Sequence, residues 1–257
     1  MMRAAIAALA LLVLASCSVE RNPARPLPAA EGMTMEELHA RVADFAPASI
    51  EFDEGALEDW EKAVLAKLVE ASDLMHGLFA RQVSRRNPEW AERVASRGAE
   101  DPGATYYDIM VGPWDRQADH APFLAAGEKP AGAGYYPEDM TAAELERWIA
   151  AHPSDREAFQ SPFTLIEREG DSLVAVPYSE AFGPELERAA ALLREAAALS
   201  ENASLTAYLE SRAASFLSND YYPSDMAWMD ISGTKIEPTI GPYEVYEDNL
   251  MGYKAAF

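Results

Sequence analysis

The chain has 257 residues, and its 43 acidic and 21 basic residues give it a formal net charge of −22 at pH 7. Such a charge repels the phosphate backbone of DNA and RNA, so we expect no nucleic-acid partner. The length suffices for one sizeable hydrophobic core or for two modest ones.

Residues 1–17 have the pattern of a lipoprotein signal peptide. One basic residue precedes an apolar run over residues 4–15, and small residues lead to Cys17. The run is too short to span a bilayer, whereas small residues before a cysteine are typical of cleavage at a lipidated thiol. We therefore expect Cys17 to carry a lipid, although a lone cysteine can also be a small buried hydrophobe. The lipid would anchor the protein in the cell envelope, and Ser18 after it indicates the outer membrane, facing the periplasm.

Residues 18–32 have the composition of a flexible tether. They are rich in Pro, Ala and Arg, and Pro23, Pro26 and Pro28 disfavour a helix. We expect this segment to join the lipid to a folded body that begins at residue 33.

Regular spacing predicts helices in the folded body. Thr34 and Glu37 form a capping-box pattern that opens the first helix, which Pro47 ends. From Leu57 to Leu78 apolar residues recur every three or four positions, which predicts one buried stripe of a long helix.

Three more helices are expected later in the chain. A second capping box begins at Thr141 and predicts a helix that ends near His152. Pro184 marks the start of the next helix, and Ser204 is interpreted as the cap of the helix after that.

The remaining segments are less regular. Residues 97–137 are rich in Gly, Pro and aromatic residues, and we expect an irregular wall of a binding cleft there. Residues 163–167 and 173–176 flank Gly170 and predict a β-hairpin. From Tyr221 onward we expect strands and turns, until residues 250–257 begin a helix. The fold class is therefore α+β, mainly α-helical, with a small β component.

Four sequence blocks carry a resemblance to a known family. The blocks are Leu74-Met75 with Phe79 and Gln82, Gly112-Pro113-Trp114-Asp115-Arg116, Gly134-Tyr135-Tyr136-Pro137-Glu138-Asp139-Met140-Thr141, and residues 233–256. In this order they resemble the dipeptidyl peptidase III family of zinc exopeptidases, especially its bacterial branch, over nearly the whole mature chain. Plant proteins that fuse a Nudix domain to the same fold share these blocks, but no Nudix signature is present here.

The resemblance implies a fold of two lobes that face each other across a cleft. Residues 33–249 would form the lower, substrate-binding lobe, with a small β-barrel or mixed sheet near the C-terminal end. Residues 250–257 would start a truncated helix that leads to the missing zinc-bearing lobe. None of the four histidines lies in a His-Glu-x-x-His or His-Glu-x-x-x-His pattern. We therefore expect no metal ligand and no catalytic residue in this chain, and zinc only in a full-length family member.

The resemblance also implies substrate-binding residues. Glu237 stands where the family places a carboxylate on the ammonium group of the substrate, although it can also be a simple exposed carboxylate at a strand end. Thr239 stands where the family usually has a tyrosine that donates a hydrogen bond near the zinc. A threonine hydroxyl reaches less far, so either Tyr243 substitutes or that contribution is lost.

Two functions remain open from the sequence. In the first, the chain is the amino-terminal part of a lipid-anchored zinc dipeptidyl-peptidase-III-like protein that binds peptides with a free amino terminus. In the second, it is a non-catalytic, lipid-anchored peptide-binding or relic protein.

Overall fold

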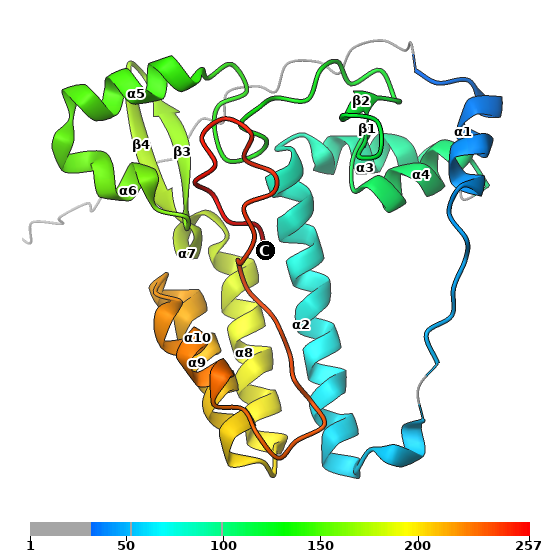
Figure 1. Cartoon of the computed structure of the whole chain (residues 1–257), viewed down its shortest axis with the longest axis vertical. Helices are drawn as coiled ribbons and strands as arrows, with labels where there is room; N and C mark the ends of the chain where they lie inside the picture. The colour runs from blue at the N-terminus through cyan, green and yellow to red at the C-terminus, as the bar shows by residue number, and fades with distance from the viewer. Residues whose placement is uncertain (1–31, 52, 99) are drawn as a thin grey trace, which may run out of the picture.

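The computed structural model describes residues 32–51, 53–98 and 100–257, and helices dominate it (Figure 1). The expected signal peptide, Cys17 and most of the tether lie outside the described residues. The strands form two antiparallel two-stranded sheets, so the mainly helical α+β class is confirmed. None of the described helices is long and apolar enough to cross a membrane.

In chain order the elements are α1 (Met35–Ala43), the 3-10 helix η1 (Glu54–Ala56), α2 (Asp59–Val83), α3 (Asn87–Ala95), α4 (Pro102–Met110), β1 (Trp114–Asp115), β2 (Ala121–Pro122), α5 (Ala142–Ala151), η2 (Pro153–Asp155), α6 (Arg156–Gln160), β3 (Thr164–Glu169), β4 (Ser172–Pro177), α7 (Tyr178–Ala181), α8 (Gly183–Leu199), α9 (Ala203–Ser218) and α10 (Tyr222–Met229).

Three long helices form the centre of the molecule. α2 packs against α8, and α8 packs against α9 (Figure 1). The predicted stripe of α2 is confirmed, because Val64, Leu68, Ala71, Met75 and Leu78 are all buried. Positions three and four apart lie on one helix face, which here faces α8. Removing one such side chain, as in Leu78→Ala, costs about 2–5 kcal/mol of stability.

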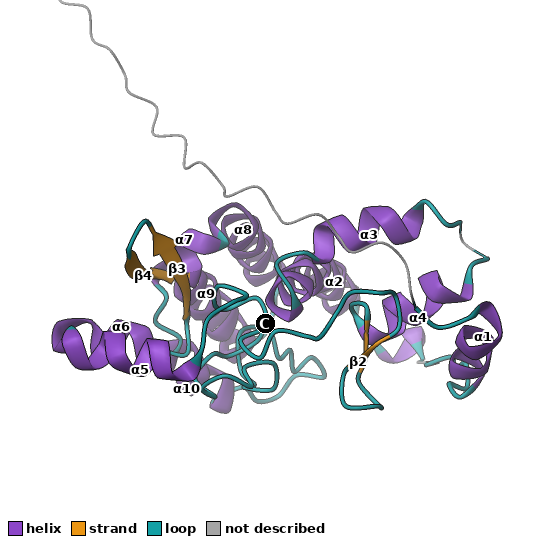
Figure 2. Cartoon of the chain, turned by 90° about the horizontal axis from the view of Figure 1, so that it is seen from above, coloured by secondary structure: helices purple, strands orange, loops and turns teal. Residues whose placement is uncertain are grey.

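The described residues bury two separate hydrophobic clusters. The larger one surrounds α2, α8, α9 and the β3–β4 hairpin. The smaller one lies between α1, α3 and α4 and includes Leu38, Trp90, Tyr106 and Phe123. Seen from above, α1, α3 and α4 lie on one side of α2, and the hairpin with α5 and α6 lies on the other (Figure 2). The α2 helix therefore links two regions, each packed around its own core.

Several predicted local structures are confirmed. The Glu37 amide donates to Thr34 Oγ1 at 3.3 Å and the Thr34 amide donates to Glu37 Oε2 at 2.7 Å, which is the expected capping box of α1. β3 and β4 pair antiparallel in the predicted hairpin. Its turn contains Gly170 with φ +62°, a conformation that a residue without a Cβ adopts at little cost.

Two helices form where other structure was expected. α4 lies inside the region predicted to be irregular, because Asp101 caps it by accepting from the Gly103 amide at 2.8 Å and Pro102 pre-sets its first turn. α10 replaces the expected strands after Tyr221, with Pro223 and Asp225 in its first turn. These helix-start signals outweighed the composition from which an irregular region was predicted at α4 and strands at α10.

The predicted cap of α9 is also wrong by two residues. Asn202, not Ser204, is the N-cap, and its Oδ1 accepts from the Leu205 amide at 2.9 Å. Ser204 lies in the first turn, where its hydroxyl donates to Asn202 Oδ1 at 2.8 Å. An asparagine side chain reaches the third amide of a helix as well as a serine does, so the two candidates compete for one position.

The C-terminal segment, red in Figure 1, runs along the central helices and ends beside them. The helix expected at residues 250–257 is not formed. Instead the buried carboxylate of Asp248 accepts hydrogen bonds from the amides of Leu250, Met251, Tyr253 and Lys254, at 2.8–3.1 Å. A single carboxylate thus accepts hydrogen bonds from four backbone amides, and the chain turns around this side chain instead of forming a helix. An isolated antiparallel bridge between Glu244 and Ala256 is the β structure described nearest the C-terminal end.

Candidate functional site

An open cavity of about 430 Å³ lies on the C-terminal segment. Its volume is within the range of roughly 300–1,000 Å³ that is common for sites of small ligands. Most of its lining comes from one short stretch of chain, residues 239–247. The lining residues are Phe79 of α2, Arg116, Thr239, Gly241, Tyr243, Glu244, Tyr246, Glu247, Ala256 and Phe257.

The backbone of this wall is fixed by hydrogen bonds. The Tyr243 amide donates to the Ala256 carbonyl at 3.1 Å, and the Ala256 amide donates to the Glu244 carbonyl at 2.8 Å. Gln82 of α2 is buried and its Oε1 accepts from the Phe257 amide at 2.8 Å. Residues 243–244 and 256–257 are therefore held together at the cavity and joined to the central helix α2.

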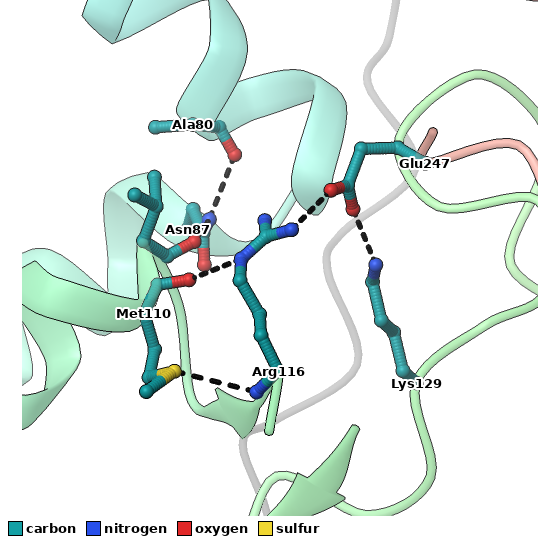
Figure 3. Close-up of polar contacts among 7 residues, drawn as sticks. Ala80, Asn87, Met110, Arg116, Lys129 and Glu247 are labelled. Carbon is teal, nitrogen blue, oxygen red and sulfur yellow. Dashed lines mark hydrogen bonds and ion pairs between the residues drawn. The ribbon is translucent and has the colours of Figure 1, made fainter. Parts of the chain in front are cut away.

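A buried charge cluster, whose contacts are drawn in Figure 3, contributes Arg116 and Glu247 to the cavity lining. Glu247 is 1 % exposed and forms ion pairs with Arg116, which follows β1, and with Lys129. Burial alone would raise the pKa of the Glu247 carboxyl, but the neighbouring Lys129 and Arg116 charges hold it below its usual value. The Arg116 side chain is fixed further, since its Nε donates to the Met110 carbonyl at 2.8 Å. It also lies over the ring of Phe79, 5.4 Å from the centroid.

A second buried cation supports the wall from behind. Arg212 of α9 is fully buried, pairs with Asp225, and lies 5.1 Å from the centroid of the Tyr243 ring. The rings of Tyr208 and Tyr221 are 5.7 and 5.5 Å from the same guanidinium carbon. This arrangement of one cation among three aromatic rings stabilises both the charge and the position of Tyr243.

Of the three binding residues predicted from the sequence, two line the cavity and one does not. Thr239 and Tyr243 both line the cavity, and burial raises the pKa of the Tyr243 phenol, so its hydroxyl is a neutral donor at physiological pH. Glu237 is exposed and is not part of the cavity lining. Its carboxylate has no hydrogen-bond or ion-pair partner among the described residues, and its role in ammonium binding stays a prediction.

Sequence reasoning missed the charged groups of the site. Arg116 belongs to one of the four recognised blocks, but its partner Glu247 lies 131 positions away, and nothing in the local pattern pairs them. Arg212 lies in a regular helix, where an arginine normally faces solvent. Gly241 was the sequence signal for a close approach of two segments at this site. Its φ of +146° shows why a glycine is required there.

The described residues contain no group of three or more His, Cys, Asp or Glu side chains that could hold a metal ion. They therefore do not fit the zinc of the family, and no hydrolytic step is assigned to them.

Known proteins match this chain in sequence and in structure. Residues 138–198 match the model of a family of unknown function (DUF6887). Nudix hydrolase 3 of Arabidopsis thaliana is 29 % identical over an alignment of 274 residues that covers 86 % of this chain and 35 % of that protein. DPP III from Caldithrix abyssi is 46 % identical with a TM-score of 0.82, over 85 % of this chain and 42 % of its own. Dipeptidyl-peptidase III from Corallococcus sp. strain EGB is 38 % identical with a TM-score of 0.83, over 90 % of this chain and 43 % of its own.

These matches define the class of the protein as a mainly helical α+β lobe with the fold found in dipeptidyl peptidase III. The resemblance to the dipeptidyl peptidase III family, and to its bacterial members in particular, is confirmed. The chain spans less than half the length of each of these relatives.

Proposed function

We propose that this chain is the peptide-binding lobe of a lipid-anchored, dipeptidyl-peptidase-III-like zinc peptidase, and that its cavity receives the amino-terminal end of a peptide. One observation carries the proposal. The block of residues 239–247, part of the longest stretch that resembles the family, is also the block that forms most of the cavity wall. The similarity to two bacterial dipeptidyl peptidases III supports the same function.

The chemistry of the cavity suits a peptide. Tyr243, Tyr246 and Phe257 offer apolar surface to side chains, while the hydroxyls of Thr239 and Tyr243 can donate to peptide carbonyls. Glu237, two residues before Thr239, would accept the ammonium group. A hydrogen bond to a charged group of this kind contributes about 1.5–3 kcal/mol.

Hydrolysis in this proposal depends on zinc ligands outside the described residues, supplied by a further part of the protein. The anchor would be a lipid on Cys17, with the folded lobe held on the periplasmic side of the outer membrane by the tether.

A second candidate is a non-catalytic peptide-binding protein on the same anchor. Thr239 favours it, because a threonine at this position lacks the reach of the tyrosine that the family usually has there. Both candidates require peptide binding, and they differ in whether bound peptide is cleaved.

The experiment uses the full chain, solubilised in detergent, and a tetrapeptide labelled at its carboxyl end. Fluorescence anisotropy compares the peptide with a free amino terminus and its Nα-acetylated form. We expect the free form to bind at least about tenfold more tightly, because acetylation removes the charge that the carboxylate recognises. Equal affinity for both forms, or no binding of either, would contradict the proposal.

A further inference from the structure

The ion pairs of the charge cluster beside the cavity are not balanced. Two cations, Arg116 and Lys129, share the single carboxylate of Glu247. This excess of one positive charge occurs in a chain that has 43 acidic and only 21 basic residues. A partly buried charge excess of this kind creates a local potential that attracts an anion.

Arg116 is the cation of the pair that faces the cavity. Its side chain is 30 % exposed and lines the cavity, whereas Lys129 is 5 % exposed and does not. Its Nε and Nη1 donate to Met110 and Glu247, and its Nη2, which is itself buried, has no hydrogen-bond partner within the described ranges. A guanidinium has five N–H donors, so Arg116 keeps unused donor capacity, but the Nη2 donors are covered by protein atoms.

Charges of both signs act on the groups near this cluster. Burial lowers the pKa of His120, the Lys129 and Arg116 charges lower it further, and the Glu247 and Asp119 charges raise it. Glu244 is the other carboxylate that lines the cavity. It is exposed, so solvent screens its charge far more than that of the buried cluster. The cavity lining thus contains the exposed carboxylate of Glu244 and the partly buried guanidinium of Arg116, which is paired with Glu247.

We propose that Arg116 binds the C-terminal carboxylate of a short peptide whose amino-terminal end occupies the rest of the cavity. This inference rests on the proposed peptide-binding function. The cavity of about 430 Å³ can hold part of a short peptide, and Arg116 lies in its lining whereas Glu237 lies outside it. Arginine suits this task because its planar guanidinium matches the geometry of a carboxylate.

The test compares three tetrapeptides with free amino termini and otherwise neutral side chains, measured by calorimetry with the full chain in detergent. The first has a free C-terminal carboxylate, the second a C-terminal amide, and the third an amide with one internal aspartate. We expect the first to bind about tenfold more tightly than the second, and Arg116→Gln to abolish that preference. Arg168→Gln is the control, since Arg168 of β3 pairs with Glu144 of α5 and does not line the cavity.

The variant Glu247→Gln distinguishes binding of an anionic ligand by Arg116 from a purely structural role of the charge cluster. Removing this carboxylate frees Arg116 from its ion pair, so we expect the preference for the free acid to increase. Equal loss of affinity for acid and amide would instead show that the cluster only supports the wall, and would overturn the proposal.

The other outcomes are also decisive. Equal binding of acid and amide by the unmodified chain refutes the role of Arg116 and leaves the proposed function intact. A peptide amide with an internal aspartate that matches the free acid refutes recognition of the C-terminus. Absence of binding for all three peptides refutes the proposed function itself.

Discussion

Gly241 lies against the guanidinium of Arg212 so closely that a Cβ atom at position 241 would come within 2.6 Å of Nη1. The same glycine has a φ of +146° and lines the cavity. One residue without a side chain therefore brings the cavity wall into contact with the buried cation behind it.

Gly241→Ala should consequently damage both the fold and the site. The added methyl group must displace a buried guanidinium, and residue 241 must keep a backbone conformation that is strained for alanine. We therefore expect a loss of about 1–3 kcal/mol in the free energy of unfolding. Urea denaturation followed by circular dichroism measures it. Gly77→Ala is the matched control, because a Cβ atom at position 77 meets nothing within 4 Å. Position 77 also lies in the α2 helix, where alanine is more favourable than glycine by about 0.5–1 kcal/mol. Similar stability changes in the two variants would contradict the close approach.

Lys254 gives a prediction about pH. Its ammonium is fully buried and donates to the carbonyls of Phe159 and Ser161 and to the Thr164 hydroxyl, each at 2.8 Å. Burial lowers its pKa from 10.5 to about 7. Between these two values the unfolded chain binds more protons than the folded one, so this residue adds stability as pH rises from about 7 to about 10.

The measurement is the free energy of unfolding of the unmodified chain and of Lys254→Met at several pH values in that range. Other groups titrate equally in both proteins, so the difference between the two curves isolates Lys254. We expect the unmodified chain to gain stability relative to the variant with rising pH. A difference that does not change with pH would show that Lys254 keeps an ordinary pKa in the fold.

Membrane attachment is tested at Cys17, which lies outside the described residues. Replacing it by serine removes the thiol that would be acylated, and a lipid is the anchor that we propose. After cell fractionation, Cys17→Ser should appear in the periplasmic fraction and the unmodified protein in the membrane fraction. Retention of the variant in the membrane would exclude the lipid anchor.

The sequence predicted the parts of the fold that local rules decide. The α2 stripe from Val64 to Leu78 and the Thr34 capping box follow from spacing within a few residues, and both are confirmed. The helix predicted at residues 250–257 is not formed, because the carboxylate of Asp248 accepts hydrogen bonds from four backbone amides. Hydrophobic periodicity in the sequence does not reveal such bonds. Asn202 and Ser204 show how two equally good caps make a helix start ambiguous.

The candidate site was predictable only in part, for a related reason. Thr239 and Tyr243 were singled out by resemblance, and both line the cavity. The pairing of Arg116 and Lys129 with Glu247 joins positions more than 100 residues apart, so it depends on the packing of the whole fold. Long-range ion pairs leave no local pattern in the sequence, whereas the segment that forms most of the wall was found through its resemblance to the family.

The central claim is that this chain recognises the free amino terminus of a peptide through Glu237. The most direct measurement is the ratio of the dissociation constants of Nα-acetylated and free peptide, for the unmodified chain and for Glu237→Gln. We predict a ratio of at least about ten for the unmodified chain and a ratio near one for the variant, with unchanged affinity for the acetylated peptide. An unchanged ratio in Glu237→Gln, or an equal loss of affinity for both peptides, would contradict the claim.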